Sequence, residues 1–197
     1  MIARRTATKI KNGSVQKKNN WTDTPNYWNT RQDEIQIDIA KPGKGYRHFI
    51  KKRDIKAFLE ILPNREEIDV ELDAVLLAPG RYNLNGWYKN GVIAICAWEK
   101  EMEQSCSIEH FEAHKEIFVR LGVKYELKKD YAILHFNENQ IKAYQLLHIF
   151  LHELGHHHDR INTKSKRRCS RGENYAESYA FKYEEIIWNK YFERFPL

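Results

Sequence analysis

Cysteine is scarce in this sequence. Cys96, Cys106 and Cys169 are the only three among 197 residues, no two of them have CxxC spacing, and Cys96 lies inside the apolar run "VIAICAW". An odd number of cysteines without paired spacing argues against a disulfide framework and against a cysteine-ligated metal. We therefore expect reduced thiols, as in a cytoplasmic protein.

Long apolar runs are absent as well. No stretch approaches the roughly 20 apolar residues that a membrane span needs, and the N-terminal "MIARRTATKIKNGS" lacks the apolar centre of a signal peptide. We expect a protein that neither crosses a membrane nor is exported. With 42% hydrophobic residues, the chain is long enough to bury one sizeable core.

The net charge of +6 is unevenly distributed. Residues 1–53 contain thirteen Lys or Arg and four Asp or Glu, whereas residues 54–197 contain twenty Lys or Arg and twenty-three Asp or Glu. Within the second part, "TKSKRRCSR" at residues 163–171 has five basic residues and no acidic one. Residues 1–31 are polar and show no periodicity, which predicts a basic, flexible arm. Both basic segments could bind nucleic acid or a DNA-bound protein, or could be solvated surface.

Residues 32–197 have the patterning of one α+β domain. Over 32–72, alternating isoleucines and "YRHFI" flank "KPGKG" and predict a hairpin, and Asp54 predicts the start of a helix that Pro63 ends. Residues 73–197 form the predicted core of this domain. Its predicted elements are a strand in "DAVLLAPG", a hairpin at Asn90-Gly91, a helix from Ser107 to Gly122, the strands "VKYEL" and "YAILHF", a helix from Asn137 through the HELGH stretch, and a helix over about 173–192.

The stretch "HELGH" at residues 152–156 ends an amphipathic helical pattern. Four residues advance about 400° on an α-helix, so His152 and His156 lie one turn apart and can reach a single ion. Glu153 projects beside them. Two imidazoles that hold Zn²⁺ and a carboxylate that accepts a proton from water are what a metal-activated hydrolase needs. Gly155 between the ligands predicts a close neighbour against the helix backbone.

The other polar residues near the motif have a simpler interpretation. A row of histidines can be solvated at a helix end and interact with the helix dipole. Rotation around the helix places His157, His158 and Asp159 off the ligand face or past its end. His148 lies one turn before His152, and we expect it to pack behind a ligand rather than to bind the ion.

A catalytic zinc site needs a third protein ligand from another element and an open fourth position. The metzincin pattern HExxHxxGxxH is excluded, because Asp159 and Asn162 stand at its glycine and at its last ligand. Downstream, "RGENYAESYAFKY" places Glu173 and Glu177 one helical turn apart. Ala176 and Ala180 are small enough to let that helix approach the first closely.

"HELGH" followed by "ENYAESYA" resembles the gluzincins, zinc metallopeptidases whose third ligand is a glutamate on a second helix. The resemblance implies that Glu173 is the ligand and that Glu177 supports a ligand histidine. With "GWYKNGVIAI", the pattern is most similar to the compact ImmA/IrrE-like peptidases and covers about residues 73–190. It implies a zincin-like α+β domain with a small mixed sheet, an HExxH helix and a C-terminal helix that carries the third ligand.

The resemblance further implies a zinc metallopeptidase that cuts an extended peptide along an edge strand, with Glu153 as the catalytic base. Tyr175, Tyr179 and Tyr183 are candidates to donate to an oxyanion, although aromatic residues at helical spacing usually belong to a core. Two alternatives remain open. One is a non-peptidase zinc protein whose basic arm binds nucleic acid or a regulatory partner, and the other is a peptidase that acts on a DNA-bound protein.

Overall fold

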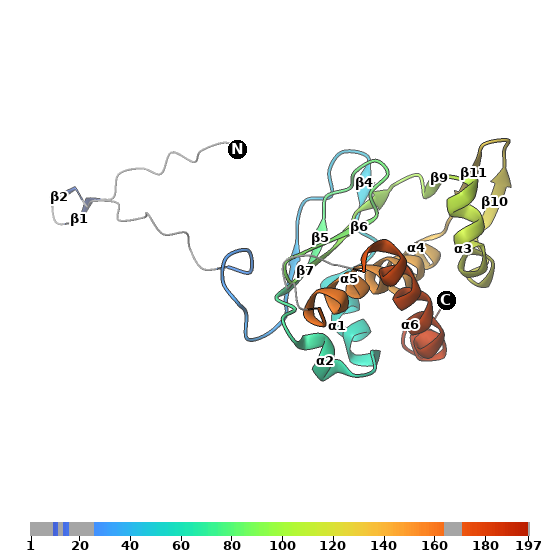
Figure 1. Cartoon of the computed structure of the whole chain (residues 1–197). Helices are drawn as coiled ribbons and strands as arrows, with labels where there is room; N and C mark the ends of the chain where they lie inside the picture. The colour runs from blue at the N-terminus through green and yellow to red at the C-terminus, as the bar shows by residue number, and fades with distance from the viewer. Residues whose placement is uncertain (1–9, 12–13, 16–25, 164–170, 197) are drawn as a thin grey trace.

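The computed structural model describes residues 10–11, 14–15, 26–163 and 171–196, and these form a mixed α+β structure (Figure 1). The predictions for most of the basic arm and for most of the basic segment 163–171 lie outside the described residues. The strands are β1 (Ile10–Lys11), β2 (Ser14–Val15), β3 (Gln36–Ile39), β4 (Tyr46–Arg47), β5 (Ala74–Ala78), β6 (Gly86–Lys89), β7 (Val92–Cys96), β8 (Trp98–Glu99), β9 (Glu103–Ser107), β10 (Lys124–Leu127) and β11 (Tyr131–His135). The helices are α1 (Lys52–Ile61), α2 (Arg65–Asp69), α3 (Ile108–Arg120), α4 (Glu138–Tyr144), the π-helix η1 (Gln145–Phe150), α5 (Leu151–Ile161) and α6 (Gly172–Arg194).

The main sheet has the strand order β3-β5-β7-β6. Strands β3, β5 and β7 run parallel, and β6 is antiparallel to β7, so the expected small mixed sheet is confirmed. All residues of β5 and β7 are buried, as their continuous apolar runs indicate for central strands. The predicted hairpin is also present, with Asn90 and Gly91 at φ values of 48° and 85°, the left-handed pair that a type I′ turn requires.

The predicted hairpin around "KPGKG" is wrong. Strand β3 pairs with β5 in parallel, whereas β4 pairs with β8. The alternating isoleucines do form a strand, and half-buried Ile37 packs against the core from the edge of the sheet. The open backbone edge of β5 takes β3 as its partner, while positive φ values at Gly43 and Gly45 carry the chain away to β8.

Helix α1 begins earlier than predicted. It starts at Lys52, and Asp54 is the third helical residue rather than the cap; its Oδ2 accepts a 2.8 Å hydrogen bond from the Lys51 backbone N–H. Aspartate is favourable at either position because both lie near the positive end of the helix dipole. The end before Pro63 is confirmed.

A second, three-stranded sheet has the order β10-β11-β9 and is antiparallel throughout. The predicted pair "VKYEL" and "YAILHF" forms β10 and β11. Helix α3 packs on this sheet at the side of the molecule away from β3 (Figure 1). The Ser107 hydroxyl accepts from the His110 N–H at 3.2 Å and caps α3 as predicted, and Gly122 follows its end with a φ of 68°.

The helix that enters the HELGH stretch is interrupted. Asn137 caps it as predicted, but α4 passes into η1 over Gln145–Phe150 before α5 begins at Leu151. The buried Gln145 amide donates a 2.8 Å hydrogen bond to the Cys96 carbonyl and ties η1 to β7. π-Helical turns occur mostly as insertions in α-helices, often at functional sites.

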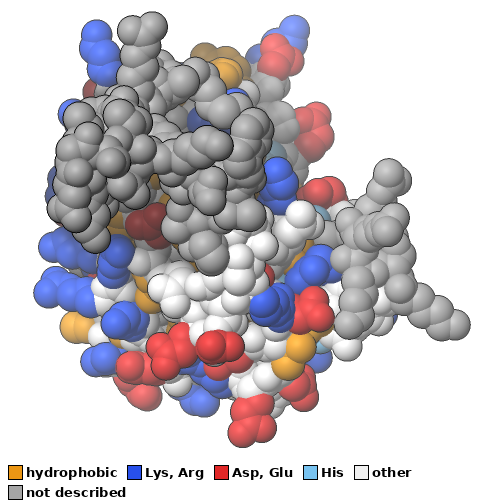
Figure 2. Space-filling model, turned by 90° about the vertical axis from the view of Figure 1, so that its left-hand side faces the viewer, with side chains coloured by type: hydrophobic (Ala, Val, Ile, Leu, Met, Phe, Trp, Pro, Cys, Tyr) orange, Lys and Arg blue, Asp and Glu red, His pale blue; other side chains and the backbone are white. Residues whose placement is uncertain are grey.

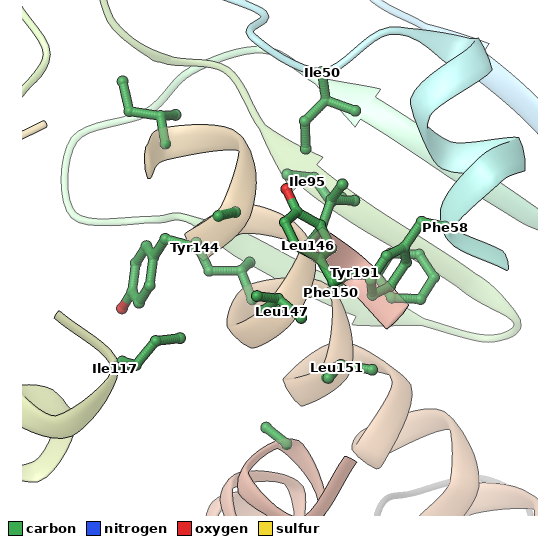
Figure 3. Close-up of a cluster of buried hydrophobic side chains, with 14 of the residues drawn as sticks. Ile50, Phe58, Ile95, Ile117, Tyr144, Leu146, Leu147, Phe150, Leu151 and Tyr191 are labelled. Atoms are coloured by element: carbon green, nitrogen blue, oxygen red, sulfur yellow. The ribbon is translucent and has the colours of Figure 1, made fainter. Parts of the chain in front are cut away.

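This composite helix is the centre of the hydrophobic core. Figure 3 shows Leu146, Phe150 and Leu151 on it, with Ile95 of the sheet, Phe58 of α1 and Tyr191 of α6 around them. Phe58 and Phe150 meet edge to face at 5.3 Å between ring centroids. Because packing on several sides holds this helix, the HELGH residues at its end stand on a rigid support.

The surface near the start of the described chain carries charges of both signs. Basic side chains lie beside acidic ones on the face shown in Figure 2. The chain from residue 26 is attached to the sheet, since Trp28 stacks on Trp87 of β6 and the Tyr27 hydroxyl donates to Asp38 at 3.0 Å. Tyr27 and Trp28 therefore hold this segment against the sheet.

Candidate metal centre

Helix α5 presents the two motif histidines to the first turn of α6. The Nε2 atoms of His152 and His156 lie 3.1 and 3.4 Å from the same Glu173 carboxylate oxygen, Oε2. The side chains of the histidines are largely buried, whereas that of Glu173 is 80% exposed. Three potential ligand atoms from two helices thus converge within 4.8 Å of one another.

The close approach of the two helices depends on Gly155. A Cβ atom at this position would lie 2.7 Å from Cα and 2.9 Å from the carbonyl oxygen of Ala176 on α6. These backbone atoms cannot move away as the tip of a flexible side chain could. The sequence predicted a close neighbour at Gly155, and that neighbour is α6. Ala176 is fully buried where the two helices meet.

Glu153 follows His152 in the sequence and packs against the start of β6. It is only 7% exposed, and its Oε1 would be 2.9 Å from a Cβ atom added to Gly86. Burial raises the pKa of this carboxyl to about 7, partly offset by His152. A carboxylate with a pKa near neutrality is suited to accept and return a proton.

Glu177 contacts the other ring nitrogen of His152, Nδ1, whereas Glu173 faces Nε2. Glu177 Oε2 accepts a 2.8 Å hydrogen bond from His152 Nδ1, which leaves the Nε2 lone pair facing Glu173. Burial by itself would raise the pKa of Glu177, but contacts with His114 and His152 hold it well below its ordinary value. For His152 the two effects have the opposite signs. Burial alone would lower its pKa, but the hydrogen bond to Glu177 outweighs burial and the pKa is raised.

His148 is packed behind this centre. It is 4% exposed and stacks on Tyr144 with ring centroids 5.4 Å apart, and its Nε2 lies 3.7 Å from Glu177 Oε1. Burial lowers its pKa to about 3, so the imidazole is neutral near pH 7. The structure therefore does not bring His148 into the cluster of His152, His156 and Glu173.

The remaining polar residues of the HELGHHHD stretch contact other parts of the fold. His157 is fully buried between the Tyr88 hydroxyl, at 3.1 Å from Nδ1, and the Val70 carbonyl, at 2.9 Å from Nε2. Asp159 is also fully buried and accepts from the Arg171 N–H at 2.8 Å. Helical rotation carries these side chains off the ligand face, as expected, but His157 and Asp159 are buried in the fold rather than solvated.

The tyrosines of α6 do not reach the centre. The Tyr175 hydroxyl lies 2.7 Å from His158 Nδ1, and Tyr179 is buried and stacks on Tyr183 at 4.3 Å. None of the three lines the cavity that contains Glu153. The geometry does not support the expected oxyanion role for them, because they lie on a different side of α6 from Glu173 and Glu177.

Two histidines that were not predicted do line this cavity. His110 and His114 come from α3, stack on each other at 4.0 Å, and lie beside His148 and Glu177. Their spacing in the sequence is the same four residues that separates His152 from His156. That spacing could have marked His110 and His114 as a pair on one face of a helix. The sequence did not indicate which part of the molecule this face would contact.

The cavity has a volume of about 690 Å³. Its walls are β6 with the two residues before it, α3, the composite helix and the start of α6. Strand β6 pairs only with β7 among the described residues, so it is an edge strand of the main sheet. An edge strand of this kind can pair with an extended chain.

The donor set fits zinc. Two imidazole nitrogens and one carboxylate oxygen that leave one position open are the ligands of many catalytic zinc sites, whereas hard cations prefer oxygen alone. His152, His156 and Glu173 are the residues that would hold the ion. The structure thus combines a possible zinc site, a buried carboxylate and an open cavity.

Comparisons with known protein families, with curated proteins and with solved structures found no match to this chain. Among the described residues, no helix combines the length and the apolar character that crossing a membrane requires.

Proposed function

We propose that this protein is a zinc-dependent metallopeptidase with a zincin-like domain. The observation that carries the proposal is the convergence of His152 Nε2, His156 Nε2 and Glu173 on one point, with buried Glu153 beside them. A site that only joined two helices would not need a carboxylate beside its ligands. The resemblance to gluzincins supports the same roles.

The chain's own residues suggest how hydrolysis would proceed. Bound zinc would supply Lewis-acid chemistry, which makes a water molecule more acidic. Glu153 would accept the proton from that water at its carboxylate and deliver it to the leaving amine. Glu177 would hold the His152 ring through Nδ1, so that Nε2 keeps its orientation toward the ion.

The substrate is an extended segment of an intracellular protein. It would add to the edge of the main sheet at β6, where backbone hydrogen bonds align a peptide without strong demands on its sequence. Gly86 brings this edge against Glu153, because any larger residue would collide with that carboxylate. The free thiols of Cys96 and Cys106 are in keeping with action in the reducing cytoplasm.

Replacing Glu153 with glutamine tests this function. The amide keeps the size of the side chain but cannot accept a proton, so we expect cleavage to fall by about a hundredfold or more. Zinc content and melting temperature should stay close to those of the wild type. The zinc-loaded protein is incubated with a library of cellular peptides, and new N-termini are counted by mass spectrometry.

Glu101→Gln on an exposed turn is the matched control and should cleave as the wild type does. Cells that express either wild-type protein or Glu153→Gln provide a second comparison, because proteins lost only with the wild type are candidate substrates. If both the peptide library and the cells show no difference between wild type and Glu153→Gln, the protein is not a peptidase.

A further inference from the structure

We propose that His114, His148 and Glu177 form a second metal-ion site, distinct from the cluster of His152, His156 and Glu173. One ligand atom from each of the three residues lies within 4.8 Å of the others. The residues come from α3, η1 and α6, which are far apart in the sequence. This site requires no catalytic activity and therefore stands independently of the proposed peptidase.

The orientation of His114 is the first argument. Its Nδ1–H donates a 2.7 Å hydrogen bond to the His110 backbone carbonyl, so in the neutral ring Nε2 carries the lone pair. That Nε2 lies 2.8 Å from Glu177 Oε1. A lone pair and a carboxylate oxygen repel each other unless a proton or a metal ion lies between them. A backbone carbonyl that fixes the ring in this way is a common support for a metal-binding histidine.

His148 is the second argument. A simple ion pair between His114 and Glu177 would not need another imidazole, yet His148 Nε2 points to the same carboxylate oxygen at 3.7 Å. The ring is 4% exposed, and its Nδ1 has no hydrogen-bond partner among the described residues. Burying a second imidazole here is understandable if Nε2 has a ligand role that compensates its desolvation.

The chemistry of the site selects a borderline cation such as Zn²⁺. Two imidazole nitrogens and one carboxylate oxygen suit zinc, whereas Ca²⁺ and Mg²⁺ prefer sites made of oxygen. All three residues line the cavity of about 690 Å³, so an ion can enter. His110 stacks on His114 and lines the same cavity.

Glu177 connects the two sites. Its Oε1 faces His114 and His148, while its Oε2 accepts from His152 Nδ1. One carboxylate therefore serves as a ligand of the second ion and as a support for a ligand of the first. The proposal also gives α3 a role, because α3 carries His114.

The test is the number of zinc ions that the full chain binds. Protein stripped with a chelator is reloaded with Zn²⁺, freed of excess metal and analysed for metal per chain. We expect two ions for the wild type, one for His114→Gln, one for the double variant His152→Ala with His156→Ala, and none when all three changes are combined. His135→Gln, which removes a half-exposed histidine elsewhere, should still bind two.

A second variant guards against misfolding. His148→Phe keeps the ring stack on Tyr144 but removes both nitrogens, and it should also bind one ion while keeping a cooperative thermal transition. One ion in the wild type that His114→Gln and His148→Phe both retain would overturn the second site. One ion that survives loss of His152 and His156 but disappears with His114→Gln would support the second site and overturn the first.

Discussion

At the scale of single residues, Glu173 and Glu177 make different contacts although they stand one turn apart on α6. Glu173 is exposed at the mouth of the cavity and faces both motif histidines, whereas Glu177 is half-buried and contacts the far nitrogen of His152. This arrangement agrees with the order that the resemblance implies. The two carboxylates can therefore be separated by measuring metal affinity.

Glu173→Ala should weaken zinc binding at the first site strongly, because it removes one of three ligands. Glu177→Ala should weaken the same site by about 10- to 100-fold, the usual effect of losing a residue that orients a ligand, and should abolish the second ion. Competition with a chromophoric chelator measures both affinities. The reverse order at the first site would mean that the two roles are exchanged.

Gly155 is the other residue whose role can be tested alone. Ala in place of a helical glycine normally stabilises by up to about 1 kcal/mol, but here Cβ would lie 2.7 Å from Ala176 Cα. Gly155→Ala should instead destabilise by about 1 to 3 kcal/mol, the usual range for overpacking. Urea unfolding measures this, with Asn189→Ala on the exposed face of α6 as the control. A stabilised Gly155→Ala would show that the helices can separate without cost.

At the scale of elements, α3 and α6 meet through a buried carboxyl. Glu184 is 3% exposed and lies 3.4 Å from an Arg120 guanidinium nitrogen. Burial raises its pKa to about 7 although Arg120 opposes the shift. The folded protein therefore holds this proton more tightly than the unfolded chain, and the stability linked to it is lost as pH rises from about 4.5 through about 7.

Glu184→Gln should thus stabilise the protein more at about pH 8 than at about pH 5, where the wild-type carboxyl is already neutral. The difference should be on the order of 1 kcal/mol or more, because one unit of pKa shift corresponds to about 1.4 kcal/mol. Thermal unfolding at the two pH values measures it. Glu193→Gln, at an exposed position, should show no such pH dependence, and an equal response of both variants would contradict the role of burial.

Several elements follow from local patterns, and others do not. Asn90-Gly91, Ser107 and Asn137 mark a turn and two helix starts because their conformation or hydrogen bonding depends on nearby residues alone. The partner of β3 is a long-range choice between open strand edges, so a hairpin was predicted where a parallel strand forms. The π-helical segment η1 could not be predicted either, because the sequence keeps the same helical pattern of apolar residues through it.

At the scale of the whole molecule, metal binding should stabilise the fold. The proposed ions join α5 to α6 and α3 to the composite helix, and a ligand that binds only the folded state adds about 4 kcal/mol at a thousand times its dissociation constant. Removing metal with a chelator should lower the melting temperature by several degrees. Combining His156→Ala with His114→Gln should abolish this response. A chelator effect that persists in that variant would place the stabilising ion elsewhere.

The sequence alone determined the chemistry of the HELGH stretch, since helical spacing by itself puts His152 and His156 on one face with Glu153 beside them. It also predicted that Gly155 needs a close neighbour, and the resemblance to gluzincins implied that Glu173 supplies the third ligand. Only the tertiary structure showed that α3 brings His114 to Glu177 and that Tyr175 and Tyr179 face away from the cavity. The physical reason is that the relative placement of helices depends on packing among segments distant in sequence, which local spacing does not encode.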